Sequence, residues 1–202
     1  MYKFVTLILF IISFNGFSQD TDGDGVNDDV DNCPTVANGT EVTTLAGGNG
    51  SGSASNQLNR PKEIIIDANG NLYISDKDNH RIQKWASGAT SGTTVAGGNG
   101  QGSAANQLDR PKGIFLDTSG NLYISDSYNH RIQKWVPGAI SGTTVAGGNG
   151  SGSASNQLNK PSEVFLDSND NLYISDKDNH RIQKWASGAT SGTTVAGGNG
   201  SG

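Results

Sequence analysis

Residues 71–85 read NLYISDKDNHRIQKW, and the stretch returns as NLYISDSYNHRIQKW at 121–135 and unchanged at 171–185. Each copy therefore begins fifty residues after the copy before it. The same period brings TTLAGGNG at 43–50 back as TTVAGGNG at 93–100, 143–150 and 193–200. Self-similarity with a period of about 40 to 50 residues is typical of the blades of a β-propeller.

One unit reads as four short β-strands and shows no helical period. Residues 63–67 are a short apolar run, which is expected for a strand that is buried on both faces. A tight turn at 68–71 leads to a second strand at 72–75. After a polar turn at 76–80, residues 81–85 alternate as a third strand, and a link rich in glycine and serine leads to the fourth at 93–96. This pattern predicts an all-β chain of four-stranded antiparallel blades.

The units resemble NHL repeats. The matching residues are NQL at the entry, separated by two residues from a proline, then the centre ending in NLYISD, then NHRIQKW. All three copies keep each element, and the resemblance covers about four fifths of the chain. It implies a propeller of about six blades, within the range that propellers span. With three complete units, residues 43–202 are expected to form a partial, open NHL-type β-propeller that belongs to a longer protein.

The fourth strand occurs once more than the other three, because residues 43–46 precede the first complete unit. We interpret this copy as a strand donated to a final blade that the sequence does not contain. Open blade edges favour self-association, because unpaired strand edges accept further strands. A dimer of two half-rings is the alternative, although each half would then bring a surplus fourth strand.

Composition and charge exclude several classes of protein. The 202 residues include 29 glycines and 16% charged residues, which does not suit a helical bundle or a coiled coil. The single cysteine, Cys33, cannot build an internal disulfide framework. A net charge of −5 argues against binding to nucleic acid. Residues 20–31 hold six aspartates and no basic residue, whereas residues 34–202 hold 13 acidic and 13 basic residues.

Residues 1–18 have the layout of a secretory signal peptide. Lys3 precedes an apolar run at 4–12, and Gly16 and Ser18 are the small residues expected before a cleavage site after Ser18. The run is too short to cross a bilayer stably, and an uncleaved N-terminal anchor is the alternative. We therefore expect a mature chain without a membrane span, located outside the cell or on its surface.

Residues 20–34, DTDGDGVNDDVDNCP, place oxygen atoms at the spacing of a calcium-binding loop. A hard cation needs six to eight oxygens, and clustered carboxylates that repel one another become ordered when they surround one. Gly25 stands at the position of the sharp turn. The expected ligands, five carboxylates at loop positions 1, 3, 5, 9 and 12 and the backbone carbonyl at position 7, are Asp20, Asp22, Asp24, Asp28, Asp31 and Val26.

The same residues resemble a thrombospondin type-3 repeat, whose signature is DxDxDGxxDxxDNCP. The match includes Asn32, Cys33 and Pro34 after the last aspartate. The resemblance implies calcium-ligand roles for the six residues above, in a repeat at 19–36 that a linker at 37–42 joins to the blades. This chain has one copy and an unpaired Cys33, which favours a dissociation constant of about 10⁻⁴ to 10⁻³ M. A solvated acidic linker is the alternative.

The residues that recur in every unit indicate structural roles. Three histidines on three separate blades do not converge on one metal: His80, His130 and His180. Asp76, Asn79 and Arg81, with their copies, are expected to form turn hydrogen bonds and blade-to-blade pairs. The repeated tyrosines and tryptophans, such as Tyr73 and Trp85, are expected to pack in the blade core or interface.

These observations together predict a secreted or cell-surface, calcium-binding protein of the interaction or adhesion type. Its propeller would bind a protein or a glycan that the sequence does not identify, and calcium would be its cofactor. The alternative is a fragment of a secreted propeller lyase or hydrolase, since NHL-like propellers resemble amidating lyases. Catalysis needs an asymmetric set of residues, and the repeated residues do not form one, so no catalytic residue is assigned.

Overall fold

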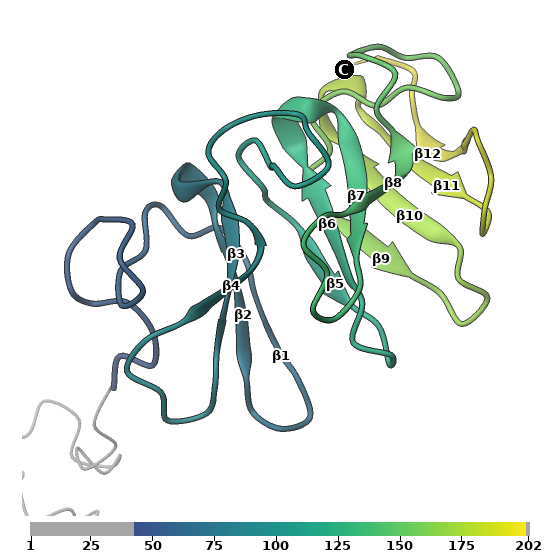
Figure 1. Ribbon diagram of the computed structural model, residues 1–202. Coiled ribbons are helices and arrows are strands. Elements are labelled where there is room, and N and C mark those ends of the chain that lie inside the picture. Colours follow the sequence, from purple (N-terminus) through teal and green to yellow (C-terminus); the bar gives the residue numbers. More distant parts are fainter. Residues whose placement is uncertain (1–42, 201–202) are drawn as a thin grey trace, which may run out of the picture. The chain divides into compact units, whose positions relative to one another are not determined.

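Strands form in each repeat where apolar side chains alternate with polar or small ones. In the first unit Leu72 and Ile74 face one side of the sheet, and Tyr73 and Ser75 face the other, because successive side chains of a strand alternate. The computed structural model describes residues 43–200 and shows the same four-stranded unit three times (Figure 1). In each sheet the strands are antiparallel and follow their order in the chain, as in a propeller blade.

The blades keep nearly identical boundaries. Blade 1 comprises β1 (Ile64–Ile66), β2 (Leu72–Asp76), β3 (Arg81–Trp85) and β4 (Thr93–Gly97). Blade 2 comprises β5 (Ile114–Leu116), β6 (Leu122–Asp126), β7 (Arg131–Trp135) and β8 (Thr143–Gly147). Blade 3 comprises β9 (Val164–Leu166), β10 (Leu172–Asp176), β11 (Arg181–Trp185) and β12 (Thr193–Gly197). The predicted all-β architecture of four-stranded antiparallel blades is confirmed.

The predicted polar turn between the second and third strands is a single 3-10 turn. It occupies Lys77–Asn79 in blade 1 (η1), Ser127–Asn129 in blade 2 (η2) and Lys177–Asn179 in blade 3 (η3). A histidine in the left-handed region ends each turn, with φ of 54° at His80. Its backbone N–H donates a hydrogen bond to the carbonyl of Lys77, and the chain then enters β3.

The apolar core lies between the blades. One face of blade 1 packs against the opposite face of blade 2, and blade 2 packs in the same way against blade 3. The fully buried members of the first interface include Ile82, Leu108 and Ile124. The second interface repeats them as Ile132, Leu158 and Ile174. Each blade is therefore stabilised mainly by its neighbours.

The prediction that the first strand of every unit is buried on both faces is wrong for the outer blades. Ile114 in β5 is 2% exposed, but Ile64 at the same position of β1 is 52% exposed. In β9 Val164 and Leu166 are buried, whereas Phe165 on the other face is 57% exposed. Within the described residues blades 1 and 3 have a neighbouring sheet on one side only. On the other side of blade 1, Ala46 and Leu58 pack on a buried cluster of Leu72, Ile74 and Trp85, and the first strand stays exposed.

Residues 43–46 do not form the strand that their sequence predicts. The three later copies of this sequence pair with β3, β7 and β11 of their own blades. Within residues 43–200 every such third strand already has its partner, so the first copy has no edge to join. Its role as a donated strand therefore stays a prediction.

Candidate functional site

The predicted calcium ligands lie outside the described residues: Asp20, Asp22, Asp24, Val26, Asp28 and Asp31. The predicted signal peptide at 1–18 and the linker at 37–42 also lie outside them. Among the described residues, no helix has the length and apolar character that crossing a bilayer requires. The site residues that can be placed are therefore those of the blades.

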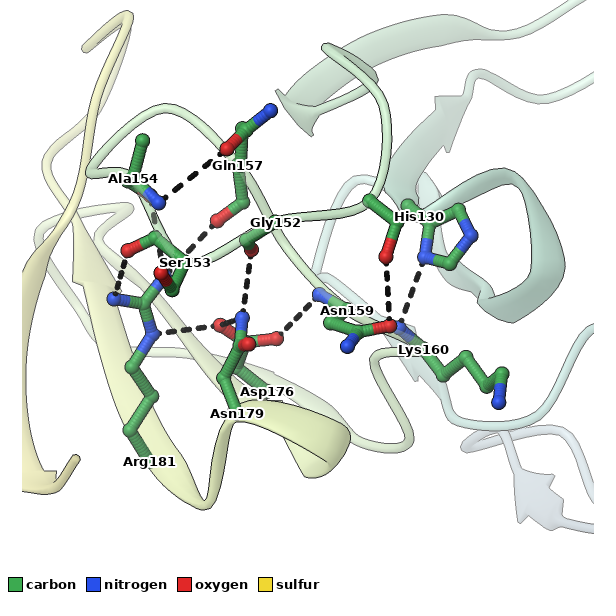
Figure 2. Close-up of polar contacts among 11 residues, drawn as sticks. His130, Gly152, Ser153, Ala154, Gln157, Asn159, Lys160, Asp176, Asn179 and Arg181 are labelled. Carbon is green, nitrogen blue, oxygen red and sulfur yellow. Dashed lines mark hydrogen bonds and ion pairs between the residues drawn. The ribbon is translucent and has the colours of Figure 1, made fainter. Parts of the chain in front are cut away.

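A buried carboxylate organises the end of the second strand in each blade. In blade 3, Asp176 Oδ2 lies 2.7 Å from Arg181 Nε and accepts a hydrogen bond from Asn179 Nδ2 at 2.8 Å (Figure 2). Asp176 Oδ1 accepts the backbone N–H of Asn159 at 2.6 Å. The carboxylate is fully buried, and all three donors point at it. The aspartate is thus held in place by charge-assisted hydrogen bonds.

The arginine of this cluster fixes the link that enters the blade. The guanidinium of Arg181 donates to the backbone carbonyls of Ser153 at 2.7 Å, Ala154 at 3.2 Å and Gln157 at 3.1 Å. Figure 2 shows the link folded around the guanidinium. Asn179 Nδ2 also donates to the carbonyl of Gly152 at 2.8 Å. Four carbonyls of the link between blades 2 and 3 are therefore satisfied by two side chains of blade 3.

The same cluster occurs in blades 1 and 2, with aspartate–arginine distances of 2.7 Å. In blade 2, burial raises the pKa of Asp126, while hydrogen bonds from the Asp109 N–H, Asn129 and Arg131 oppose that shift. The predicted role of these residues in turn hydrogen bonding is confirmed. The predicted blade-to-blade pairing is wrong in detail, because the arginine binds the link of its own blade and not the next sheet. Their donors and acceptors are occupied, which leaves them little capacity for chemistry.

Histidine makes one of the polar contacts between neighbouring blades. His130 Nδ1 accepts the backbone N–H of Lys160 at 3.1 Å, and His80 Nδ1 accepts that of Arg110 at 3.2 Å. Burial lowers the pKa of His130, and the charge of Lys160 lowers it further. The structural role predicted for the histidines is confirmed. Over residues 43–200 the structure contains no group of three histidine, cysteine or acidic side chains that is placed to hold a metal.

One carboxyl pair was missed by the sequence analysis. The carboxyl groups of Glu63 and Glu163, which precede β1 and β9, lie close together although blade 2 separates their strands in the chain. Glu63 Oε2 also accepts the backbone N–H of Ile114 at 2.6 Å. At the same repeat position blade 2 has Gly113, where a Cβ would lie 2.9 Å from Glu163 Oε2. Gly113 interrupts the repeat where the other two blades have glutamate, and this difference was the feature of the sequence that could have indicated the pair.

The environment of this pair alters proton binding. Burial raises the pKa of Glu63 to about 7; the N–H of Ile114 opposes the shift, and the neighbouring Glu163 carboxylate adds to it. A half-buried carboxyl beside a second carboxylate retains its proton, because two adjacent negative charges repel each other. Glu63 is therefore the described carboxyl with the properties of a proton donor near neutral pH.

A polar groove opens between blades 2 and 3. Its volume is about 950 Å³, and its lining includes Tyr123, Asn149, Asp170, Trp185 and Thr190. The corresponding groove between blades 1 and 2 has about 350 Å³, and its lining includes Ile140. Ile140 occupies the repeat position that is threonine in blade 3. The larger groove thus has threonine at the position where the smaller groove has isoleucine.

The fold and the blade contacts define an open β-propeller. A family model of the NHL repeat matches residues 58–85, 108–135 and 158–185, which span the first three strands of each blade. The chain thus contains three NHL repeats, and each matched segment lies within one blade. A model of the thrombospondin type 3 repeat matches residues 18–41, which include all six predicted calcium ligands.

Solved structures share this fold at low sequence identity. An auxiliary nutrient binding protein from Bacteroides thetaiotaomicron is 21% identical, with a TM-score of 0.50 over 60% of this chain and 36% of that chain. A chain of a nidogen/laminin complex is 23% identical, with a TM-score of 0.51 over 68% of this chain and 47% of that one. A catalytically inactive virginiamycin B lyase from Staphylococcus aureus, solved with quinupristin, is 12% identical, with a TM-score of 0.49 over 71% and 42%.

The chain covers less than half the length of each of these structures. For the nutrient binding protein and the nidogen/laminin chain, identities of this size show the fold alone. A search of curated proteins by sequence found no match. The activity and partners of the whole protein are therefore matters for proposal.

Proposed function

We propose that this chain is a secreted or cell-surface calcium-binding interaction protein, in which the NHL blades form the binding scaffold. The thrombospondin type 3 match over residues 18–41 supports a calcium-binding module, because it contains six oxygen donors at the spacing a hard cation requires. Calcium would order this module in an extracellular environment, where the ion is abundant. The blades would then present a protein or glycan surface.

The observation that carries the scaffold role is the use of the repeated polar residues. In every blade the aspartate, asparagine and arginine of the cluster bind one another and the entering link. In blades 1 and 2 the histidine accepts a backbone N–H of the next blade. Residues used in this way stabilise a rigid platform, and function on such folds resides in the surface that the platform presents.

The groove between blades 2 and 3 is the surface best suited to a ligand. Its lining combines amide, hydroxyl and aromatic side chains with one basic and one acidic residue, Lys134 and Asp170. Neutral hydrogen-bonding side chains beside aromatic groups suit an oligosaccharide or a polar peptide more than a strongly charged ligand. We therefore assign partner binding to this groove.

Terbium luminescence and calorimetry with calcium test the module. The chain should bind calcium in a saturable manner at millimolar concentration or below, and Asp24→Asn should weaken binding at least tenfold because it removes a charged ligand. Val26→Ala is the matched control, since Val26 would contribute only its backbone carbonyl. Linear, non-saturable uptake up to several millimolar calcium contradicts the proposal.

Binding to an array of neutral oligosaccharides and to extracellular-matrix proteins tests the groove. Thr190→Ile places in the large groove the residue that its smaller counterpart contains, and it should reduce binding. Thr90→Ile is the matched control, because Thr90 occupies the same repeat position and lines neither groove. Equal loss with both variants, or with neither, assigns the ligand to another surface.

N-terminal sequencing of the protein recovered from an expressing host tests export. Cleavage after Ser18 should leave Gln19 as the first residue. Protein retained in the cell with Met1 in place contradicts a secreted or surface location.

A second candidate function is a propeller enzyme, and the Glu63–Glu163 pair favours it. A carboxyl that titrates near pH 7 can both donate and accept a proton during catalysis. Glu163→Gln would then abolish turnover of a panel of ester and lactone substrates while leaving the fold intact. If neither the wild type nor Glu163→Gln turns over any of these substrates, the result contradicts the enzyme and favours the scaffold.

A further inference from the structure

The turn between the second and third strands has a different sequence in blade 2. It reads Ser-Tyr-Asn there and Lys-Asp-Asn in the other two blades, so Tyr128 stands where they have Asp78 and Asp178. The Tyr128 residue is 39% exposed. The function proposed above does not use this difference between the blades.

In blades 1 and 3 the aspartate of the turn neutralises a basic residue of the link that enters the blade. Asp78 Oδ2 lies 3.4 Å from Arg60 Nη1 in blade 1. Asp178 Oδ2 lies 2.9 Å from Lys160 Nζ in blade 3. The residue at the same repeat position of blade 2 is Arg110. Two blades thus pair an entering cation with a carboxylate of their own turn.

Arg110 lacks that carboxylate. Its guanidinium carbon lies 4.8 Å from the centroid of the Tyr128 ring. Over residues 43–200 no acidic side chain lies within ion-pair distance of the Arg110 guanidinium. The charges of Asp78 and Asp109 do act on it, but Asp78 is paired within blade 1 and Asp109 Oδ2 accepts a hydrogen bond from Gln101 at 3.1 Å. An aromatic ring attracts a guanidinium less strongly than a carboxylate does, so Arg110 retains capacity for an anion.

A second cation without an acidic partner belongs to the same site. Within the part of the chain that the structure describes, the ammonium group of Lys112 forms no ion pair. The guanidinium of Arg110 lowers the pKa of the Tyr128 hydroxyl most strongly, and the charges of Lys160 and Lys112 lower it further. Three positively charged side chains therefore surround one exposed phenol, and Lys160 alone among them has a carboxylate partner, Asp178.

The backbone holds these side chains in place. The N–H of Arg110 donates to His80 Nδ1 at 3.2 Å, and the N–H of Lys112 donates to the carbonyl of Ser125 at 3.0 Å. The N–H of Tyr128 donates to a carbonyl of the link that enters blade 2, at 3.2 Å. A site whose backbone is fixed before binding loses less conformational entropy when a ligand arrives.

We propose that Arg110, Lys112 and Tyr128 form a binding site for a carboxylate group, which an acidic peptide segment of a partner protein supplies. The ligand carboxylate takes the role toward Arg110 that the turn aspartate has toward the entering cation in the other blades. It accepts hydrogen bonds from the guanidinium, the ammonium and the phenol hydroxyl, all of which are donors. Clusters of basic side chains are a common means of recognising acidic peptide motifs.

The extent of the site favours a short acidic peptide over a long polyanion. The entering cations on either side, Arg60 and Lys160, are already neutralised by aspartates, and those aspartates repel further negative charge. None of the three binding residues lines the polar groove between blades 2 and 3. The proposal therefore depends neither on that groove nor on calcium binding.

Isothermal titration calorimetry of the whole chain with a hexaglutamate peptide capped at both ends, at low ionic strength and without calcium, tests the proposal. The wild type should bind the peptide saturably, and Arg110→Gln should weaken binding about tenfold or more, because it removes a charged donor. Lys84→Gln is the matched control: it removes the same charge, and Lys84 pairs with Tyr73 near the end of β2 and β3 that lies away from the turn. Absence of saturable binding up to about 1 mM peptide, or equal weakening by both variants, overturns the proposal.

Tyr128→Asp gives the sharper test. It introduces into blade 2 the aspartate that the other blades have, so its carboxylate should pair with Arg110 and prevent peptide binding. Tyr128→Phe keeps the ring and removes only the hydroxyl, so it should weaken binding about threefold to tenfold. Tyr128 is exposed, and circular dichroism should show unchanged folding for both variants. Peptide affinity that is unchanged by Tyr128→Asp overturns the site.

Other anions are titrated in the same way to identify the occupant. Polygalacturonate represents an acidic glycan, and sodium sulfate represents a simple anion. Both should bind more weakly than the peptide. Polygalacturonate that binds through Arg110 when the peptide does not, or sulfate that binds as tightly as the peptide, overturns the assignment to an acidic peptide.

Discussion

Blade 2 and its two neighbours are nearly identical in sequence, but only blade 2 has both faces covered by another sheet within the described chain. Ile114 of blade 2 is buried, whereas Ile64 of blade 1 is exposed at the same repeat position. Inside each blade, by contrast, the buried aspartate–arginine pair is the same in all three. The comparison separates contacts that a blade makes by itself from contacts that need a neighbour.

The largest expected effect concerns the contacts that each blade makes by itself. Asp126→Ala and Asp176→Ala should each reduce the free energy of unfolding by about 3 to 5 kcal/mol, because each leaves a buried guanidinium without its partner. Urea denaturation measures both. Arg60→Ala is the control: its ion pair with Asp78 is exposed and should contribute about 0 to 1 kcal/mol.

A large difference between Asp126→Ala and Asp176→Ala would contradict the interpretation that the cluster is complete within one blade. The two variants should lose similar free energies of unfolding, although within the described residues blade 3 has a neighbouring blade on one side only.

The next effect concerns the contacts that need a neighbour. Ile114→Ala should cost about 2 to 5 kcal/mol, because it leaves a cavity between blades 1 and 2. Ile64→Ala should cost about 0.5 kcal/mol or less, as an exposed substitution does. Both are measured by urea denaturation. Equal costs would contradict the interpretation that packing against a neighbouring blade makes the difference between Ile114 and Ile64.

A smaller effect is expected at the histidines. His130→Ala leaves the Lys160 N–H without its acceptor and should reduce the free energy of unfolding by about 1 kcal/mol. His180→Ala should cost less, because no described backbone N–H donates to His180 Nδ1. The pKa of His130 lies below its ordinary value of 6.5, so the folded state favours the neutral ring. Its contribution is complete above pH 6.5 and is lost as the pH falls through the lower value in the folded state.

The free energy of unfolding of the wild type and of His130→Ala, measured over a range of pH, checks this direction. The difference between the two proteins should become smaller as the pH falls below 6.5. Parallel curves in that range would show that the ring is protonated equally in both states.

The smallest effect concerns the carboxyl pair that joins blades 1 and 3. The pKa of Glu63 is raised from 4.5 to about 7, so its proton stabilises the folded state below pH 4.5, and that stabilisation is lost as the pH rises through about 7. Because Glu63 is only half buried, the change should be of order 1 kcal/mol. Glu63→Gln should flatten the profile over this range, as thermal unfolding at a series of pH values will show.

Glu163→Ala is the companion variant. It removes the neighbouring charge and should lower the pKa of Glu63 in the folded state, so the loss of stability should still begin near pH 4.5 but end at a lower pH.

Much of the fold was predictable from particular residues. The alternation RIQKW placed the third strand at 81–85, where the structure has β3, and NLYISD placed the second within one residue of β2. The segment TTLA at 43–46 resembles the fourth strand of each blade but forms no strand, because a strand also needs an edge to pair with. The Glu63–Glu163 pair was missed because the two residues lie one hundred positions apart, and only the angle between blades brings them together.

The sequence by itself determined the blade, because the fifty-residue period, the alternation within each strand and the turn residues are local properties. It also placed oxygen donors at calcium spacing in residues 20–31, which lie outside the described structure. The tertiary structure decided which faces are covered, which histidines have a partner and where the two glutamates meet. Identical residues differ in these respects because burial and pKa depend on neighbouring atoms, and neighbours are set by the packing of whole blades.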